Sequence, residues 1–107
     1  MKNLVLVLTE PNDGKQQQFD DYYENLHLDE VLATTGWATA QRFELVDQAG
    51  GTCPLPHLAI YEVDADSPQD ILPTLNRTRS ERQQSDALNR KSACVWVFGE
   101  TGKLHSR

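Results

Sequence analysis

Three polar side chains recur at the spacing of an α-helix. Tyr23, His27 and Glu30 stand at positions i, i+4 and i+7, so they would lie along one side of a helix and could form a hydrogen-bonded chain. Imidazole titrates near neutral pH, and a neighbouring carboxylate can orient it or raise its pKa. His27 is therefore the best candidate for proton transfer, assisted by Glu30 or Tyr23. The alternative is a structural, hydrogen-bonded histidine at a helix edge, because stabilising networks also use such pairs.

The same residues offer little to a metal ion. His27 and Glu30 could supply two ligands, but no convincing third ligand is marked, and the other histidines stand alone in the sequence. Cys53 and Cys94 lack metal-ligand spacing, so we expect two reduced thiols. We expect no metal and no cofactor. A haem held axially by His27 has little support.

Aromatic side chains could wall a pocket for an apolar ligand. Trp37, Tyr61 and Trp96 fall in predicted strands and could line a cavity between helices and sheet that accepts a planar or hydrophobic molecule. Core packing explains the same residues and is the more common outcome. Arg42 is either a ligand-binding or interface ion-pair residue, or a rim charge of little energetic weight.

The elements that would position these residues follow from periodicity and turn residues. Apolar runs predict four strands, over residues 4–8, 37–46, 57–63 and 93–98. An uninterrupted stretch with helical spacing predicts a helix over 15–32, which Gly36 should terminate. Alternation along the second strand places Trp37 and Arg42 on opposite faces.

A second helix is predicted after the third strand. A Ser-Pro pair at 67–68 is typical of a helix start, and the helix should run to about residue 82, restarting or kinking at Pro73. The resulting order, β-α-β-β-α-β, predicts an α+β, ferredoxin-like fold. It has an antiparallel four-stranded sheet with two helices on one face.

Size and net charge restrict the function classes. A chain of 107 residues fits a single domain, 1–107, and its core is thin enough that we expect a partner subunit to cover one sheet face. The formal net charge of -6 works against binding to nucleic acid or to an anionic membrane surface. The apolar runs are too short for a membrane span and no signal-peptide pattern is present, so we expect a cytoplasmic protein.

The charge is unevenly distributed. Residues 1–50 hold three basic and nine acidic side chains, whereas residues 51–107 hold seven of each. Within 76–91 the basic side chains outnumber the acidic ones, and they are Arg77, Arg79, Arg82, Arg90 and Lys91. This run could form a local anion-attracting patch, although a solvated helix face is the more common explanation.

Residues 19–43 resemble a known pattern. An aromatic pair precedes an Asn and a helical His by a few positions, then a Gly-aromatic step opens the second strand and an Arg-aromatic pair follows. This pattern is similar to that of the EthD-type branch of the dimeric α/β-barrel superfamily. One position departs from it, because Asp29 stands where the family commonly has proline.

The resemblance implies a homodimer in which two sheets pack into a shared barrel and each subunit has a cavity between its sheet and helices. It implies hydrophobic or aromatic small-molecule substrates and activities such as cofactor-free monooxygenase, cyclase or isomerase. His27 would match the family's helical histidine, Tyr22 and Tyr23 its aromatic pair, and Arg42 its strand arginine.

Two hypotheses about function follow. The first is a small cytoplasmic enzyme in which His27 moves a proton on an apolar or aromatic metabolite. The second is a non-catalytic ligand-binding protein or an accessory protein of an oxidoreductase system.

Overall fold

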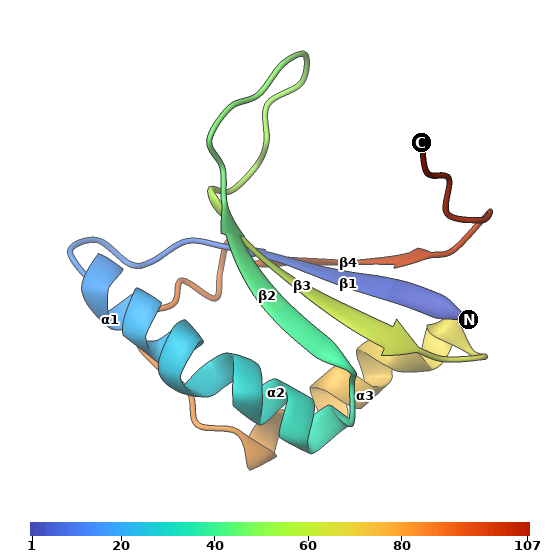
Figure 1. Cartoon of the computed structure of the whole chain (residues 1–107). Coiled ribbons are helices and arrows are strands. Elements are labelled where there is room, and N and C mark those ends of the chain that lie inside the picture. The colour runs from blue at the N-terminus through green and yellow to red at the C-terminus, as the bar shows by residue number, and fades with distance from the viewer.

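Strands and helices follow one another in the predicted β-α-β-β-α-β order (Figure 1). The computed structural model describes all 107 residues. The strands are β1 (Lys2–Thr9), β2 (Thr39–Glu44), β3 (His57–Asp64) and β4 (Cys94–Gly99). The helical segments are α1 (Gln16–Tyr22), the π-helical turn η1 (Tyr23–His27), α2 (Leu28–Thr35), the 3₁₀ turn η2 (Pro68–Asp70), α3 (Ile71–Arg77) and the 3₁₀ turn η3 (Arg79–Glu81).

The four strands form one antiparallel sheet in the order β2-β3-β1-β4. Val5 in the central strand β1 pairs with Tyr61 on one side and Val97 on the other. The helices cover one face of the sheet (Figure 1). This confirms the predicted α+β, ferredoxin-like fold class. None of the helices has the length and apolar character that a membrane span requires.

The core lies between the sheet and the helices. Val5, Phe19, Val31 and Tyr61 are each no more than 1% exposed, and they come from β1, α1, α2 and β3. Burying a side chain of this size contributes about 1.5 to 3 kcal/mol. The alternating burial of β3 shows which of its faces meets the helices.

The long first helix contains one irregular turn. The helix extends from Gln16 to Thr35, and its residues 23–27 adopt π-helical geometry. Gly36 ends it with a left-handed φ of 77° and donates its N–H to the Leu32 carbonyl at 2.9 Å. The predicted termination at Gly36 is confirmed, because glycine adopts this conformation without steric cost. The periodicity did not predict the π turn.

The second helix differs from its predicted form. In place of one helix over 67–82, the chain forms η2, α3 and η3 in succession. Pro73 lies in the first turn of α3, where a backbone N–H has no partner within the helix, so it costs no hydrogen bond. The helix therefore starts again just before Pro73.

The structure corrects the predicted faces of β2. Trp37 precedes the strand, and its ring packs against Tyr61 at 5.6 Å on the helix side. Arg42 pairs with Ala59 in the register and also lies on the helix side. Trp37 and Arg42 do not lie on opposite faces, because strand alternation does not extend back to residue 37.

The other face of the sheet is apolar and uncovered. Trp96 pairs with Leu6 on this face and is 42% exposed. In Figure 1 the loop between β2 and β3 and the tail after β4 extend on the side of the sheet away from the helices. The large side chains of this face are Leu4, Leu6, Phe43, Leu58, Ile60, Trp96 and Phe98. We call this surface the open face.

Candidate functional site

A cavity of about 200 Å³ lies between the helices and the sheet and brings several of the predicted residues together. Its walls include Tyr23 and His27 from η1, Val31 from α2, Tyr61 from β3 and Arg82 from the segment after η3. The sheet contributes Val7, Thr9, Tyr61 and Val95 to it, and the segments after α3 contribute its three arginines. We call this space the His27 cavity.

His27 is held by a tyrosine hydroxyl. Its Nδ1 lies 2.9 Å from the Tyr22 hydroxyl, and the two rings stack with centroids 4.8 Å apart. The pair is separated by five residues, which the π-helical turn brings onto one side of the helix. The irregular turn therefore creates this contact, and π-helical turns often occur at functional sites.

The hydrogen bonds of Tyr22 determine the tautomer of His27. The Tyr22 hydroxyl donates its single proton to the Gln83 carbonyl at 2.9 Å. It can then only accept from His27, so the proton of the neutral imidazole resides on Nδ1. Nε2 carries the free lone pair and makes no hydrogen bond within the protein. The nitrogen left for a ligand is therefore a proton acceptor.

The surroundings of His27 keep it neutral. Burial, with a smaller contribution from the positive charge of Arg82, lowers the pKa of His27 from 6.5 to about 4. Burial likewise raises the pKa of Tyr22 to about 12. At neutral pH both groups are uncharged, and the hydrogen-bond direction just described applies.

Glu30 binds the neighbouring segment and not His27. Its Oε1 accepts the Gln83 N–H at 2.9 Å, while Tyr22 binds the carbonyl of the same residue. Two helix side chains thus hold the backbone next to Arg82. The predicted role of Glu30 in orienting His27 or raising its pKa is wrong, because the π turn and this bond direct it to Gln83.

The other predicted tyrosines line the cavity. The Tyr23 ring meets His27 edge-on at 5.0 Å and makes no hydrogen bond to it, so the predicted Tyr23–His27 hydrogen bond is also wrong. Burial raises the pKa of Tyr23 and of Tyr61. Both phenols therefore remain protonated at neutral pH and available as hydrogen-bond donors.

The two tryptophans lie outside the cavity. Trp37 lines a separate hollow of about 250 Å³ with Val63 and Ile71. Trp96 lies on the open face, which points away from the helices. The predicted pocket of Trp37, Tyr61 and Trp96 does not form, because Trp37 packs against Tyr61 on the helix side whereas Trp96 lies on the opposite face of the sheet.

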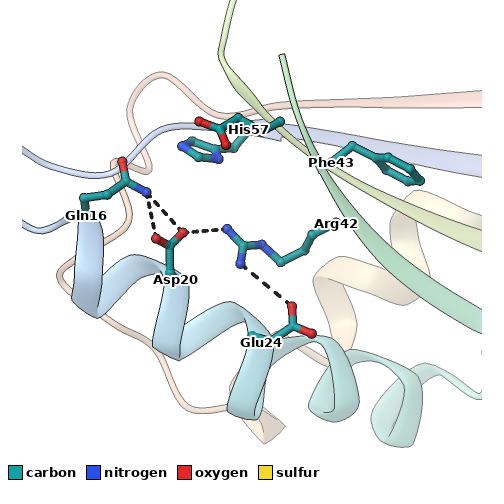
Figure 2. A pocket seen from close by; sticks show the side chains of 7 residues that line it. Gln16, Asp20, Glu24, Arg42, Phe43 and His57 are labelled. Atoms are coloured by element: carbon teal, nitrogen blue, oxygen red, sulfur yellow. Dashed lines mark hydrogen bonds and ion pairs between the residues drawn. The ribbon is translucent and has the colours of Figure 1, made fainter. Parts of the chain in front are cut away.

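Arg42 belongs to an ion-pair cluster. Figure 2 shows its guanidinium between two carboxylates, with Nη2 2.8 Å from Asp20 and Nη1 3.8 Å from Glu24. The charge also lies over the rings of Phe19 and Tyr23, 5.7 and 5.5 Å from their centroids. The hydrogen bond from Arg42 lowers the pKa of Asp20.

The surroundings of Arg42 do not suit an acidic ligand. A pocket of about 610 Å³ beside it is lined by the carboxylates of Asp20, Glu24 and Glu44, together with His57. Three negative charges face one arginine here, so an anion would be repelled. Arg42 forms ion pairs that join the first helix to β2, as one of its two predicted roles has it, and it does not line the His27 cavity.

Arg82 is the main cavity residue that no sequence motif indicated. It is 7% exposed, and its guanidinium donates to the hydroxyls of Thr34 (2.9 Å) and Thr78 (2.7 Å) and to the Leu75 carbonyl (2.9 Å). Its Nε is buried without a partner. All of its partners are neutral, and burial lowers its pKa. The excess of arginine in 76–91 was the only signal in the sequence that pointed to it.

No group of three or more histidine, cysteine or acidic side chains is placed to hold a metal ion. Cys53 and Cys94 are free thiols. The residues around His27 are phenols, aliphatic side chains and arginines, together with Thr9, Asn76 and Gln84.

Comparison with known proteins supports the fold. No protein-family model matches the sequence, and no curated protein matches it. The structure is similar to that of an ethyl tert-butyl ether D (EthD) family protein from Bacillus halodurans, with a TM-score of 0.55 and 15% sequence identity. The match covers 94% of this chain and 100% of the other. The chain therefore has an EthD-type fold.

Proposed function

We propose that this protein is a small cytoplasmic enzyme that binds an apolar or aromatic metabolite in the His27 cavity and transfers a proton through His27. The observation that carries the proposal is the Tyr22–His27–Gln83 arrangement, which leaves the Nε2 lone pair without a partner. The phenols of Tyr23 and Tyr61 line the same cavity and can donate hydrogen bonds to a ligand oxygen. The EthD-type fold is consistent with this reading.

The size of the cavity limits the ligand. Its volume is about 200 Å³, and an apolar cavity of about 150 Å³ is large enough for benzene. A ligand with one ring and a short substituent therefore fits, whereas a fused polycyclic molecule requires movement of the walls. The free Nε2 and the phenol donors suit proton transfer at a carbon next to a carbonyl, as in isomerisation or cyclisation.

The test compares His27→Asn with the wild type. The asparagine amide can replace Nδ1 as a donor to Tyr22, but it offers no basic nitrogen at the position of Nε2. Deuterium exchange at the acidic C–H of single-ring ketones and unsaturated lactones is followed by NMR in D₂O. We expect His27→Asn to slow the catalysed exchange by about 10² to 10⁴. Equal rates in both proteins contradict the catalytic role.

One observation favours a second candidate function. A general base is most effective when its pKa lies near the working pH, and the pKa of His27 is about 4. A protein that binds the ligand without reacting with it, as a carrier or an accessory protein of an oxidoreductase system, needs only the hydrogen bond at Nε2. Ligand retention without any His27-dependent exchange would support this second function.

We also propose that a second copy of the chain covers the open face. Trp96 and Phe98 are 42% and 54% exposed there, and Phe43 is 45% exposed. Such a contiguous apolar surface is a common mark of a protein interface. The open face is continuous with two projecting segments, the β2-β3 loop and the C-terminal tail, whose Val46 and Leu104 are each 94% exposed (Figure 1). Two such faces can pack against each other as a two-layered sheet.

Native mass spectrometry tests this proposal. We expect a species near twice 12.1 kDa for the wild type and a monomer for Trp96→Ser/Phe98→Ser. The matched control is Leu72→Ser, which changes an exposed apolar residue of α3 away from the open face. A wild-type monomer at micromolar concentration contradicts the proposal.

A further inference from the structure

The His27 cavity is positively charged although the chain is acidic. Its lining includes Arg79, Arg82 and Arg90 and contains no aspartate or glutamate. None of the three forms an ion pair with a carboxylate, because the intrachain ion pairs engage only the N-terminus, Lys2, Lys15 and Arg42. Three unpaired cations around one cavity, in a protein of net charge -6, form a local site that attracts anions.

Arg82 is the centre of this site. Arg82 is 7% exposed and forms no ion pair, although the charges of Glu30 and Glu81 act on it from a distance. A buried charge without a paired counter-ion is costly to the folded state. The hydroxyls and the carbonyl that bind it satisfy part of its hydrogen-bonding capacity but none of its charge, and Nε has no partner at all. A bound anion supplies the missing negative charge.

We propose that the His27 cavity binds a single-ring organic anion, a carboxylate or an enolate, whose charge is met by Arg82 and whose ring lies against the apolar wall. This inference rests on the proposed ligand-binding role of the cavity and specifies the chemical class of the ligand. The apolar wall is formed by Val7 and Val95 of the sheet and Val31 of α2. Arg79 and Arg90 are exposed and add positive charge at the entrance.

The anion has a predictable effect on His27. Arg82 contributes to the low pKa of His27, so a negative charge beside Arg82 offsets that contribution and favours the imidazolium. The charged and titratable groups around His27 are Tyr22, Tyr23 and Glu30 on its own helix, Tyr61 on β3, and Arg79, Arg82 and Arg90. The only carboxylate among them is held by Gln83. Binding of the anion should therefore raise the pKa of His27 toward the range useful for proton transfer.

The experiment uses benzoate and benzamide as probes, because they have the same size and shape but differ in charge. Both are titrated at constant ionic strength into full-length, ¹⁵N-labelled protein, and binding is followed through the His27 ring signals. We expect benzoate to bind about tenfold more tightly than benzamide, since charge-assisted hydrogen bonds are stronger than neutral ones. We also expect only benzoate to raise the pKa of His27. Equal affinities, or no benzoate binding at millimolar concentration, overturn the inference.

Matched arginine variants test which side chain binds the carboxylate of benzoate. Arg82→Gln should abolish the preference for benzoate, whereas Arg42→Gln should leave it unchanged, because Arg42 lies outside the cavity. If Arg82→Gln does not fold, the exposed pair Arg79→Gln/Arg90→Gln replaces it, with an expected loss of about two- to threefold in benzoate affinity. If Arg82→Gln or Arg79→Gln/Arg90→Gln folds and binds benzoate with unchanged affinity, the inference is overturned.

The outcome is separable from that of the proposed function. A wild-type protein that shows no preference for benzoate but retains His27-dependent proton exchange contradicts the anion site alone. An intact benzoate preference without any His27-dependent exchange contradicts the proton-transfer role and leaves the anion site standing.

Discussion

The Tyr22 hydroxyl connects the two halves of the candidate site, and its removal should destabilise the protein by a predictable amount. In Tyr22→Phe the His27 Nδ1–H and the Gln83 carbonyl both lose their partner at 2.9 Å. A buried polar group without a partner costs about 1 to 3 kcal/mol. Gln83 is exposed enough for its carbonyl to bind water in place of the hydroxyl. The total loss should therefore be about 2 kcal/mol.

Thermal and urea-induced unfolding, followed by circular dichroism, measure this loss. For a domain of this size about 2 kcal/mol lowers the Tm by about 10 °C. Tyr61→Phe is the matched control, because Tyr61 is 1% exposed and its hydroxyl makes no hydrogen bond within the protein. The control should cost less than about 1 kcal/mol. A loss in Tyr22→Phe no larger than in Tyr61→Phe would refute the assignment of both hydrogen bonds.

Three further predictions concern pH, the ion-pair cluster and the end of the first helix. The folded-state pKa of His27, about 4, lies below its ordinary value of 6.5, so its contribution to stability is full above pH 6.5 and is lost as the pH falls toward 4. Wild type should lose up to about 3 kcal/mol more than His27→Asn over this range in urea titrations, and parallel curves would contradict the low pKa. Arg42→Ala leaves Asp20 and Glu24 without their cation and should cost about 1 to 2 kcal/mol, with the pKa of Asp20 rising toward its ordinary value in an NMR titration; an unmoved Asp20 pKa would exclude the ion pair. Gly36→Ala forces a Cβ into a φ of 77° and should cost about 1 kcal/mol, measured by the midpoint of unfolding, and unchanged stability would count against the left-handed cap.

The order of the elements was predictable because the local signals agree with one another. The first and third strands are short, mostly apolar runs, and a helical pattern without glycine or proline lies between the first two strands. Gly36 marks the end of that pattern and adopts the left-handed conformation expected of it. Where local propensity and global packing point the same way, the sequence alone suffices for the fold.

The site was harder to predict because it depends on departures from regular geometry. The expected i, i+4 pairing joined His27 to Tyr23, but the π turn shifts the contact by one residue and joins it to Tyr22. Nothing in the residue types of 23–27 distinguishes a π turn from an α turn. Glu30 was likewise assigned to His27, and its real partner is a backbone group 53 residues away in sequence.

Arg82 illustrates a different limit. It belongs to an irregular segment that follows a 3₁₀ turn, so no periodicity indicates which way it points. Its environment is created by Thr34 on α2 and by Leu75 and Thr78 around α3, segments that meet only in the folded protein. The local excess of arginine suggested an anion-attracting patch, and the fold gathers Arg79, Arg82 and Arg90 around one cavity.

The state of His27 is the central claim, and NMR of ¹⁵N-labelled histidine tests it most directly. Long-range ¹H–¹⁵N correlations across a pH titration report both the protonated nitrogen and the pKa of the ring. We expect a neutral ring at pH 7, with the proton on Nδ1, a proton-free Nε2 and a pKa of about 4. A proton on Nε2, or a pKa at or above the ordinary 6.5, would contradict it.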